Sequence, residues 1–186
     1  DKIWDHAPYE GTDEELQGAR DILAERIADL ADVRGLVRDA FAKKAVVTSE
    51  VVTPKPAAPT KYEQYYDFQE PIAEIPSHRF LAIRRGQKEG VLWVRLVVDK
   101  APLVARIAEI VGAGDDANLH LAVEDAYKRL LAPSCEIDVN VEKKLEADRQ
   151  AVEVFAENLR HLLLAAPLGE KKVLAIEKQY RRGLIT

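Results

Sequence analysis

Residues 65–98 read YYDFQEPIAEIPSHRFLAIRRGQKEGVLWVRLVV. In this stretch prolines and glycines mark the expected ends of helices and strands most clearly. Pro71 ends an aromatic-rich segment. Pro76 and Ser77 are typical of a helix start, because the first turn tolerates proline and a serine hydroxyl accepts a hydrogen bond from a free N–H group. We therefore expect a helix over residues 78–85.

A turn and a strand are expected after this helix. Gly86 and Gly90 bracket the polar residues QKE. Residues 91–98 are rich in β-branched and aromatic side chains, with Arg95 as their only charge, and this composition predicts a strand. The expected helix–turn–strand unit is a framework that neighbouring helices enclose, and not a reaction centre.

The sequence before residue 65 predicts two helices, a strand and a connector. Residues 12–15, TDEE, are a capping box, so a helix is expected to follow to about residue 31. A second helix is expected over residues 33–43. The β-branched run 46–52 predicts a strand that pairs with residues 91–98. Residues 53–60, TPKPAAPT, hold three prolines and predict an extended connector.

A short helix is expected over residues 61–68, after the connector. It would bring four aromatic side chains near one another: Tyr62, Tyr65, Tyr66 and Phe68. These rings could stack on bases, but aromatic residues at this spacing more often pack in a core.

Helices dominate the rest of the chain. They are expected over residues 102–111, 117–131 and 134–165, with Pro133 as the break between the last two. The longest carries an apolar stripe of Leu145, Val152, Phe155, Ala156, Leu159, Leu162 and Leu163. A final strand is expected over residues 173–176. The predicted fold class is mainly α, a multi-helix body with a small β element of about two or three short strands.

Composition excludes some classes of protein. The chain has 186 residues, 47% of them hydrophobic, and a net charge of −5, which argues against a phosphate grip over the whole surface. No apolar run reaches the roughly 20 residues of a membrane-spanning helix. The mixed, acidic N-terminal sequence predicts no signal peptide, and the single cysteine fits the reducing cytoplasm. The lack of methionine predicts that this is a piece of a longer protein.

Two groups of basic residues are candidates for phosphate contact. The central group is Arg79, Arg84, Arg85, Lys88 and Arg95, and the C-terminal group is Lys171, Lys172, Lys178, Arg181 and Arg182. A helix end beside a glycine-rich turn can present such side chains to phosphate. They can equally offset the helix dipole, and Arg79 can pair with Glu70 or Glu74. The candidate nucleic-acid-binding residues are Arg84, Arg85, Lys88, Arg181 and Arg182.

The sequence predicts no catalytic residue, metal site or cofactor. His78 has no evident nucleophile or orienting carboxylate, and we expect it to tie the helix start to the preceding turn. Cys135 lies near an expected helix N-terminus, which can lower a thiol pKa, but it has no base or resolving thiol. The histidines and Cys135 lack metal-ligand spacing.

Three groups of residues occur in a distinctive order. The central group contains Tyr66-Asp67-Phe68-x-Glu70-Pro71, Ile75-Pro76-Ser77-His78-Arg79 and Arg85-Gly86-x-x-Glu89-Gly90-Val91-Leu92. The flanking groups are GARDILAE at residues 18–25 and VFAENLRHLLLAAP at residues 154–167. Together they resemble the Tex family of bacterial transcription accessory proteins, from near residue 16 to the end of the chain.

The resemblance implies a domain plan. Residues 1–52 are a helical segment with a short strand, 53–60 the connector, and 61–168 a central helical region with the helix–turn–strand unit and the long helix. Residues 169–186 are similar to the start of an RNase-H-like (YqgF) domain. In its first turn Tyr180, Arg181 and Gly183 match the family, Glu177 stands at the acidic position, and Lys178, Gln179 and Arg182 depart from the pattern.

The resemblance also implies a function. Tex-type proteins are long chains that end in helix-hairpin-helix and OB-fold RNA-binding domains, and this chain would be a cytoplasmic scaffold within one. Its partners would be RNA or single-stranded DNA, held through the full-length protein. One alternative is a protein-interaction module that docks onto RNA polymerase or another transcription factor. Another is a hydrolase with Glu177 in a metal site that this chain does not complete; we expect no enzyme.

Overall fold

The computed structural model describes residues 12–53, 60–167 and 169. These fall into two compact units, one up to Val152 and one from Glu153. The expected strand at residues 173–176 and the turn with Glu177 lie outside the described residues, as does all but Gly169 of the expected RNase-H-like segment.

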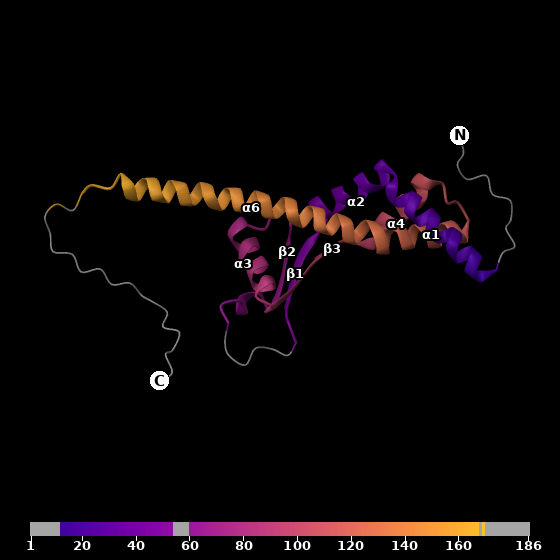
Figure 1. Cartoon of the computed structure of the whole chain (residues 1–186), viewed down its shortest axis with the longest axis horizontal. Helices are drawn as coiled ribbons and strands as arrows, with labels where there is room; N and C mark the ends of the chain where they lie inside the picture. Colours follow the sequence, from indigo (N-terminus) through magenta and orange to yellow (C-terminus); the bar gives the residue numbers. More distant parts are fainter. Residues whose placement is uncertain (1–11, 54–59, 168, 170–186) are drawn as a thin grey trace. The chain divides into compact units, whose positions relative to one another are not determined.

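The described chain is mainly helical with one small sheet, which confirms the predicted fold class (Figure 1). The helices are α1 (Asp13–Asp29), α2 (Ala31–Lys44), α3 (Ser77–Lys88), α4 (Lys100–Val111), α5 (Ala117–Asp125) and α6 (Ala132–Leu163). A 3₁₀ turn, Glu63–Tyr65, precedes the second strand, and a π-helical segment, Ala126–Leu131, joins α5 to α6. The strands are β1 (Val46–Val51), β2 (Asp67–Pro71) and β3 (Leu92–Val97).

The sheet has the strand order β2-β1-β3 and is antiparallel throughout. The predicted pairing of residues 46–52 with 91–98 is confirmed, with Val47 opposite Leu96. The predicted helix over residues 61–68 is wrong. Only the 3₁₀ turn forms there, and β2 pairs with β1 from Asp67 onward, because backbone pairing along an existing strand outweighs a weak local helix preference.

One backbone donor on the β3 edge of the sheet is satisfied by a helix. The backbone N–H of Leu96, on the outer side of β3, donates to the Glu136 carboxylate of α6 at 2.9 Å. This bond satisfies an edge donor that a neighbouring strand would otherwise take.

The helix α3 is longer than predicted at both ends. Gly86 lies inside it, where an added Cβ would stand 2.6 Å from Leu92 Cδ1, so this glycine allows helix and strand to approach closely. The helix ends before Gly90, whose φ of 71° is left-handed. At the start, Pro76 and not Ser77 is the N-cap residue, and the Ser77 hydroxyl donates to Gln150 Oε1 of α6 at 2.5 Å.

The predicted capping box of α1 is confirmed. The Thr12 side chain accepts from the Glu15 backbone N–H, and the Glu15 carboxylate accepts from the Thr12 N–H at 2.9 Å. The pKa of Glu15 is lowered by the hydrogen bonds that its carboxylate accepts from the Thr12 N–H and, at 3.0 Å, from the Thr12 hydroxyl. Behind this start, α1 packs against α5 and the π segment.

The predicted break at Pro133 is wrong. The chain continues from α5 through the π segment into α6, with Pro133 in the first turn of α6. The Ala132 N–H bonds to Tyr127 O, five residues back, so the hydrogen-bond ladder widens just before the proline. A widened turn of this kind lets a helix absorb a residue that lacks a backbone donor.

The predicted apolar stripe of the longest helix is present but exposed. Only Cys135, Val139 and Ala147 of α6 are buried. The stripe residues Leu145, Val152, Phe155, Leu159, Leu162 and Leu163 are 42–76% exposed, so no described part of the chain covers them. No described helix combines the length and the apolar character that crossing a bilayer requires.

Candidate nucleic-acid interface

The basic residues of α3 differ in whether their side chains are engaged by other residues of the protein. Arg79 is half-buried, and its Nη1 donates to both oxygens of Glu70, at 2.8 and 2.7 Å. Its guanidinium also lies 5.9 Å from the centroid of the Phe68 ring. Arg79 therefore ties α3 to β2, as one of the alternatives from the sequence had it.

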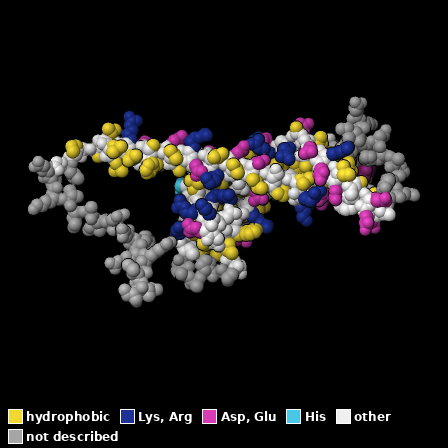
Figure 2. All heavy atoms as spheres, viewed as in Figure 1, with side chains coloured by type: hydrophobic (Ala, Val, Ile, Leu, Met, Phe, Trp, Pro, Cys, Tyr) yellow, Lys and Arg dark blue, Asp and Glu magenta, His cyan; other side chains and the backbone are white. Residues whose placement is uncertain are grey.

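The other three cations lie toward the C-terminal end of the helix. Arg84 is half-buried and donates to Gln87 Oε1 at 2.6 Å. Arg85 and Lys88 are exposed, and neither forms an ion pair with the described residues. Figure 2 shows Lys and Arg side chains gathered over the part of the molecule that carries α3. Arg85 and Lys88 are also in the last turn of α3, where positive charge offsets the helix dipole.

A carboxylate borders this end of α3. Glu89 accepts from Lys61 Nζ at 3.0 Å, and that hydrogen bond is the main reason that the pKa of Glu89 is lowered. The charge of Arg85 lowers it further. The candidates Arg181 and Arg182 lie outside the described residues, so only Arg84, Arg85 and Lys88 are placed.

The outward face of β3 carries a second arrangement that the sequence did not single out. Trp93 and Arg95 are two residues apart, so their side chains emerge on the same face. The Trp93 side chain is 57% exposed, and the Arg95 guanidinium lies 5.4 Å from its ring centroid. The sequence did hold a signal for this arrangement, because an arginine and a tryptophan stand at alternate positions of the predicted strand.

The tyrosine cluster before β2 is packed into the body. Tyr62 and Tyr65 are buried, Tyr66 and Phe68 are half-buried, and the Tyr65 and Phe68 rings meet edge to face at 5.5 Å. The buried rings of Tyr62 and Tyr65 are therefore not open to bases.

His78 and Cys135 are not part of a reactive constellation. His78 is exposed, and no hydrogen bond joins it to the preceding turn in the described structure, so its expected tie is wrong. Cys135 is buried, and burial raises the pKa of its thiol. The helix runs unbroken through this position, so no free N-terminus lies there to lower that pKa. Over the described ranges, no three His, Cys, Asp or Glu side chains gather as a metal site would require.

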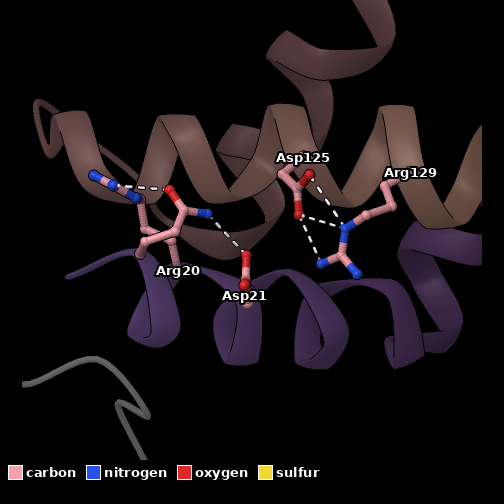
Figure 3. Close-up of polar contacts among 5 residues, drawn as sticks. Arg20, Asp21, Asp125 and Arg129 are labelled. Carbon is pink, nitrogen blue, oxygen red and sulfur yellow. Dashed lines mark hydrogen bonds and ion pairs between the residues drawn. The ribbon is translucent and has the colours of Figure 1, made fainter. Parts of the chain in front are cut away.

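Two separate polar clusters lie on neighbouring helices, one on α1 and one where α5 passes into the π segment (Figure 3). On α1, Gln17 accepts from Arg20 at 3.0 Å and donates to Asp21 at 2.9 Å. Arg129 donates to Asp125 at 2.8–3.3 Å, which is the main cause of its raised pKa, and Asp21 contributes to it across the interface. The Asp125–Arg129 pair joins the end of α5 to the π segment, and the bonds of Gln17 stay within α1.

Among the described residues, two further grooves lie outside α3. One, of about 300 Å³, lies between α2, the turn after β2 and α6. Its charged residues are paired: Glu142 with Arg38, and Lys143 with Glu146 at 3.2 Å. The other, of about 530 Å³, lies at the C-terminal end of α4, where His120 Nε2 is 2.9 Å from Gly114 O. Neither presents a nucleophile and a base together.

Comparison with known proteins gives a consistent family match. A family model described as Tex central region-like matches residues 4–155. The chain is 35% identical to the Bacillus subtilis protein YdcI over 176 residues, with 92% of this chain and 24% of that protein covered. It is 35% identical to the transcriptional accessory protein Tex of Neisseria gonorrhoeae over 178 residues, with 91% and 24% covered. A more distant relative is the human S1 RNA-binding domain-containing protein 1, at 25% identity over 189 residues, with 89% and 18% covered.

The chain therefore spans about a quarter of the length of the bacterial relatives it matches. Most of each relative lies outside the matched region.

Proposed function

The chain belongs to the Tex family of transcription accessory proteins, and from that membership we propose that it is an architectural segment of a longer nucleic-acid-binding protein. In this role it joins an N-terminal region to RNase-H-like and RNA-binding domains, and it performs no chemistry of its own. The names of two relatives, one a transcriptional accessory protein and the other an S1 RNA-binding domain-containing protein, support the wider context.

The observation that carries this proposal is the exposed apolar face of α6. From Glu153 onward its exposed side chains include Phe155, Leu159, Leu162 and Leu163, at 42–76% exposure. Burying one such side chain contributes about 1.5–3 kcal/mol, so a surface that covers the row gains substantially. We assign that covering surface to the rest of a longer protein. The bacterial relatives are about four times as long as the part of them that this chain matches.

Hydrogen exchange of residues 153–163 tests the scaffold role. In the 186-residue chain alone, these amides should exchange fast, because a helix with no packed face is marginal in water. In a full-length Tex protein that carries this sequence they should be protected. Leu159→Asp in that protein should restore fast exchange, whereas the matched surface change Glu157→Gln should not. Fast exchange in both proteins would rule out the scaffold role for this helix.

A secondary contact with nucleic acid is supported by the cations of α3. Arg85 and Lys88 are exposed and without ion pairs among the described residues, and Arg84 lies beside them. Because the chain is net negative, such a contact is local and weak, and it adds to the grip of other domains.

Salt-dependent gel shifts test this contact. The double variant Arg85→Ala/Lys88→Ala should reduce the salt slope of RNA or single-stranded DNA binding by about two, roughly one for each cation that no longer neutralises a phosphate. The charge-matched control Lys43→Ala/Arg106→Ala should leave the slope unchanged. If the chain binds no nucleic acid but captures purified RNA polymerase subunits, its role is that of a protein-interaction module instead.

A further inference from the structure

We propose that the outward face of the β2-β1-β3 sheet is a stacking platform for bases of single-stranded nucleic acid, with Trp93 and Arg95 as its centre. This inference goes beyond the scaffold role and depends on neither α6 nor the cations of α3.

The register of the sheet fixes which side chains share the face. Trp93 stands opposite Glu50 of β1, and Arg95 stands opposite Thr48. On the other side of β1, Gln69 of β2 stands opposite Thr48. The row Gln69–Thr48–Arg95 therefore crosses all three strands beside Trp93.

The opposite face of the sheet is occupied by the body of the protein. Val47 and Leu96 are buried there, and Leu92 touches the position of Gly86 on α3. Along β3 the outward face is open as far as the described residues go, since Trp93 is 57% and Val97 49% exposed. Two large apolar side chains, Trp93 and Val97, are thus left exposed on one face of β3.

The ring and the guanidinium form a preassembled pair of planar groups. Arg95 lies over Trp93 at 5.4 Å from the ring centroid, within the range of a cation–π contact. Bases stack on aromatic rings and on guanidinium planes, and stacking requires no particular base. The amide of Gln69 and the hydroxyl of Thr48 add hydrogen-bonding groups at the same level.

The size of the face favours nucleotides over a protein partner. Three strands about 4.8 Å apart, with a rise of about 3.4 Å per residue, offer a face of only roughly 300 Å². A stable protein interface needs about 800 Å² on each side. A few stacked nucleotides fit the smaller area.

The charges on the face predict where the phosphates run. Glu50 and Asp67 share the row of Trp93 and repel phosphate. Arg95 lies in the next row, so the sugar–phosphate backbone would pass over Arg95 and away from the two carboxylates. This gives an unusual expectation: neutralising Glu50 should strengthen binding of nucleic acid, whereas it would weaken binding of a basic peptide.

Tryptophan fluorescence provides a direct test. The sequence has two tryptophans, so Trp4→Phe leaves Trp93 as the reporter. Titration with oligothymidylate at low salt should quench its emission saturably, because a stacked base quenches the ring. In that background Arg95→Ala should weaken binding by about tenfold, Glu50→Gln should tighten it severalfold, and Arg106→Ala, which removes a cation from α4, should have no effect.

The opposite results would overturn the proposal. Absence of saturable quenching, quenching that Arg95→Ala does not change, or a loss of affinity in Glu50→Gln each excludes a base-stacking platform. If a lysine-rich peptide shifts the emission of Trp93 and oligothymidylate does not, the face binds protein. Far-ultraviolet circular dichroism of each variant shows whether the fold is intact, as expected for exposed positions.

Discussion

Single residues account for several features that local sequence patterns did not determine. Gly86 is the clearest case. From the sequence a glycine beside a polar run reads as a helix end, but here it lies in mid-helix because Leu92 and Tyr62 occupy the space that a Cβ would need, at 2.6 and 3.2 Å. These contacts come from tertiary packing, so the local sequence around Gly86 could not predict them.

Gly86→Ala should therefore destabilise the protein. Overpacking costs about 1–3 kcal/mol, and the better helix propensity of alanine returns roughly 1 kcal/mol, so we expect a net loss of up to about 2 kcal/mol by urea denaturation. Gly18→Ala on α1 is the matched control, because its added Cβ meets nothing within 4 Å and should stabilise. Equal stabilisation by both substitutions would contradict the close approach of α3 and β3.

Cys135 gives a second prediction at a single position. Its buried thiol has a raised pKa, so the folded state keeps its proton at a pH where the unfolded chain has lost it. The stability that this thiol contributes is fully present below the unfolded pKa of about 8.5 and is lost as pH rises through the folded pKa. Iodoacetamide at pH 8 should label the native chain far more slowly than the urea-unfolded chain. Equal rates would show that the thiol is open to solvent.

At the level of helices and strands, the sequence was most informative where an element depends on its own residues. The capping box of α1 and the β-branched strands β1 and β3 formed as expected. The second strand and the continuation of α5 through Pro133 were missed, because β2 forms on the template of β1 and the π segment supplies the widened turn before the proline.

The start of α5 offers a test of one such local signal. Asp116 is the N-cap residue, and its carboxylate accepts from the Asn118 and Leu119 N–H groups at 2.9 and 3.1 Å. Asp116→Ala should lower the free energy of unfolding by about 0.5–2 kcal/mol. Asp115→Ala, which removes the same charge at the preceding position, should change the free energy of unfolding little. Thermal denaturation of the pair would refute the assignment if the order were reversed.

Across the whole molecule, the candidate site was only partly predictable. The sequence located the cations of α3, but it could not show that Arg79 is engaged by Glu70 while Arg85 and Lys88 remain exposed. Nor could it show the Trp93–Arg95 face, since the register with β1 places those residues together with Thr48 and Glu50. The sequence also could not show that the apolar stripe of α6 is exposed, because burial of a helix face depends on what packs against it.

The exposed apolar row of α6 predicts how the chain behaves alone. At high concentration the 186-residue chain should self-associate, because large uncovered apolar surfaces promote association in water. Phe155→Glu/Leu159→Glu should keep it monomeric in light scattering after size exclusion, while Glu157→Gln should not. A wild-type chain that stays monomeric at every concentration would contradict this expectation.

The hydrogen bond between the Leu96 amide and the Glu136 carboxylate couples the sheet to α6. It anchors the rim of the sheet to the early turns of α6, so a sliding or rolling displacement of that helix would strip the amide of its acceptor. Because a buried amide without an acceptor is unfavourable, the position of the early part of α6 is coupled to that of β3.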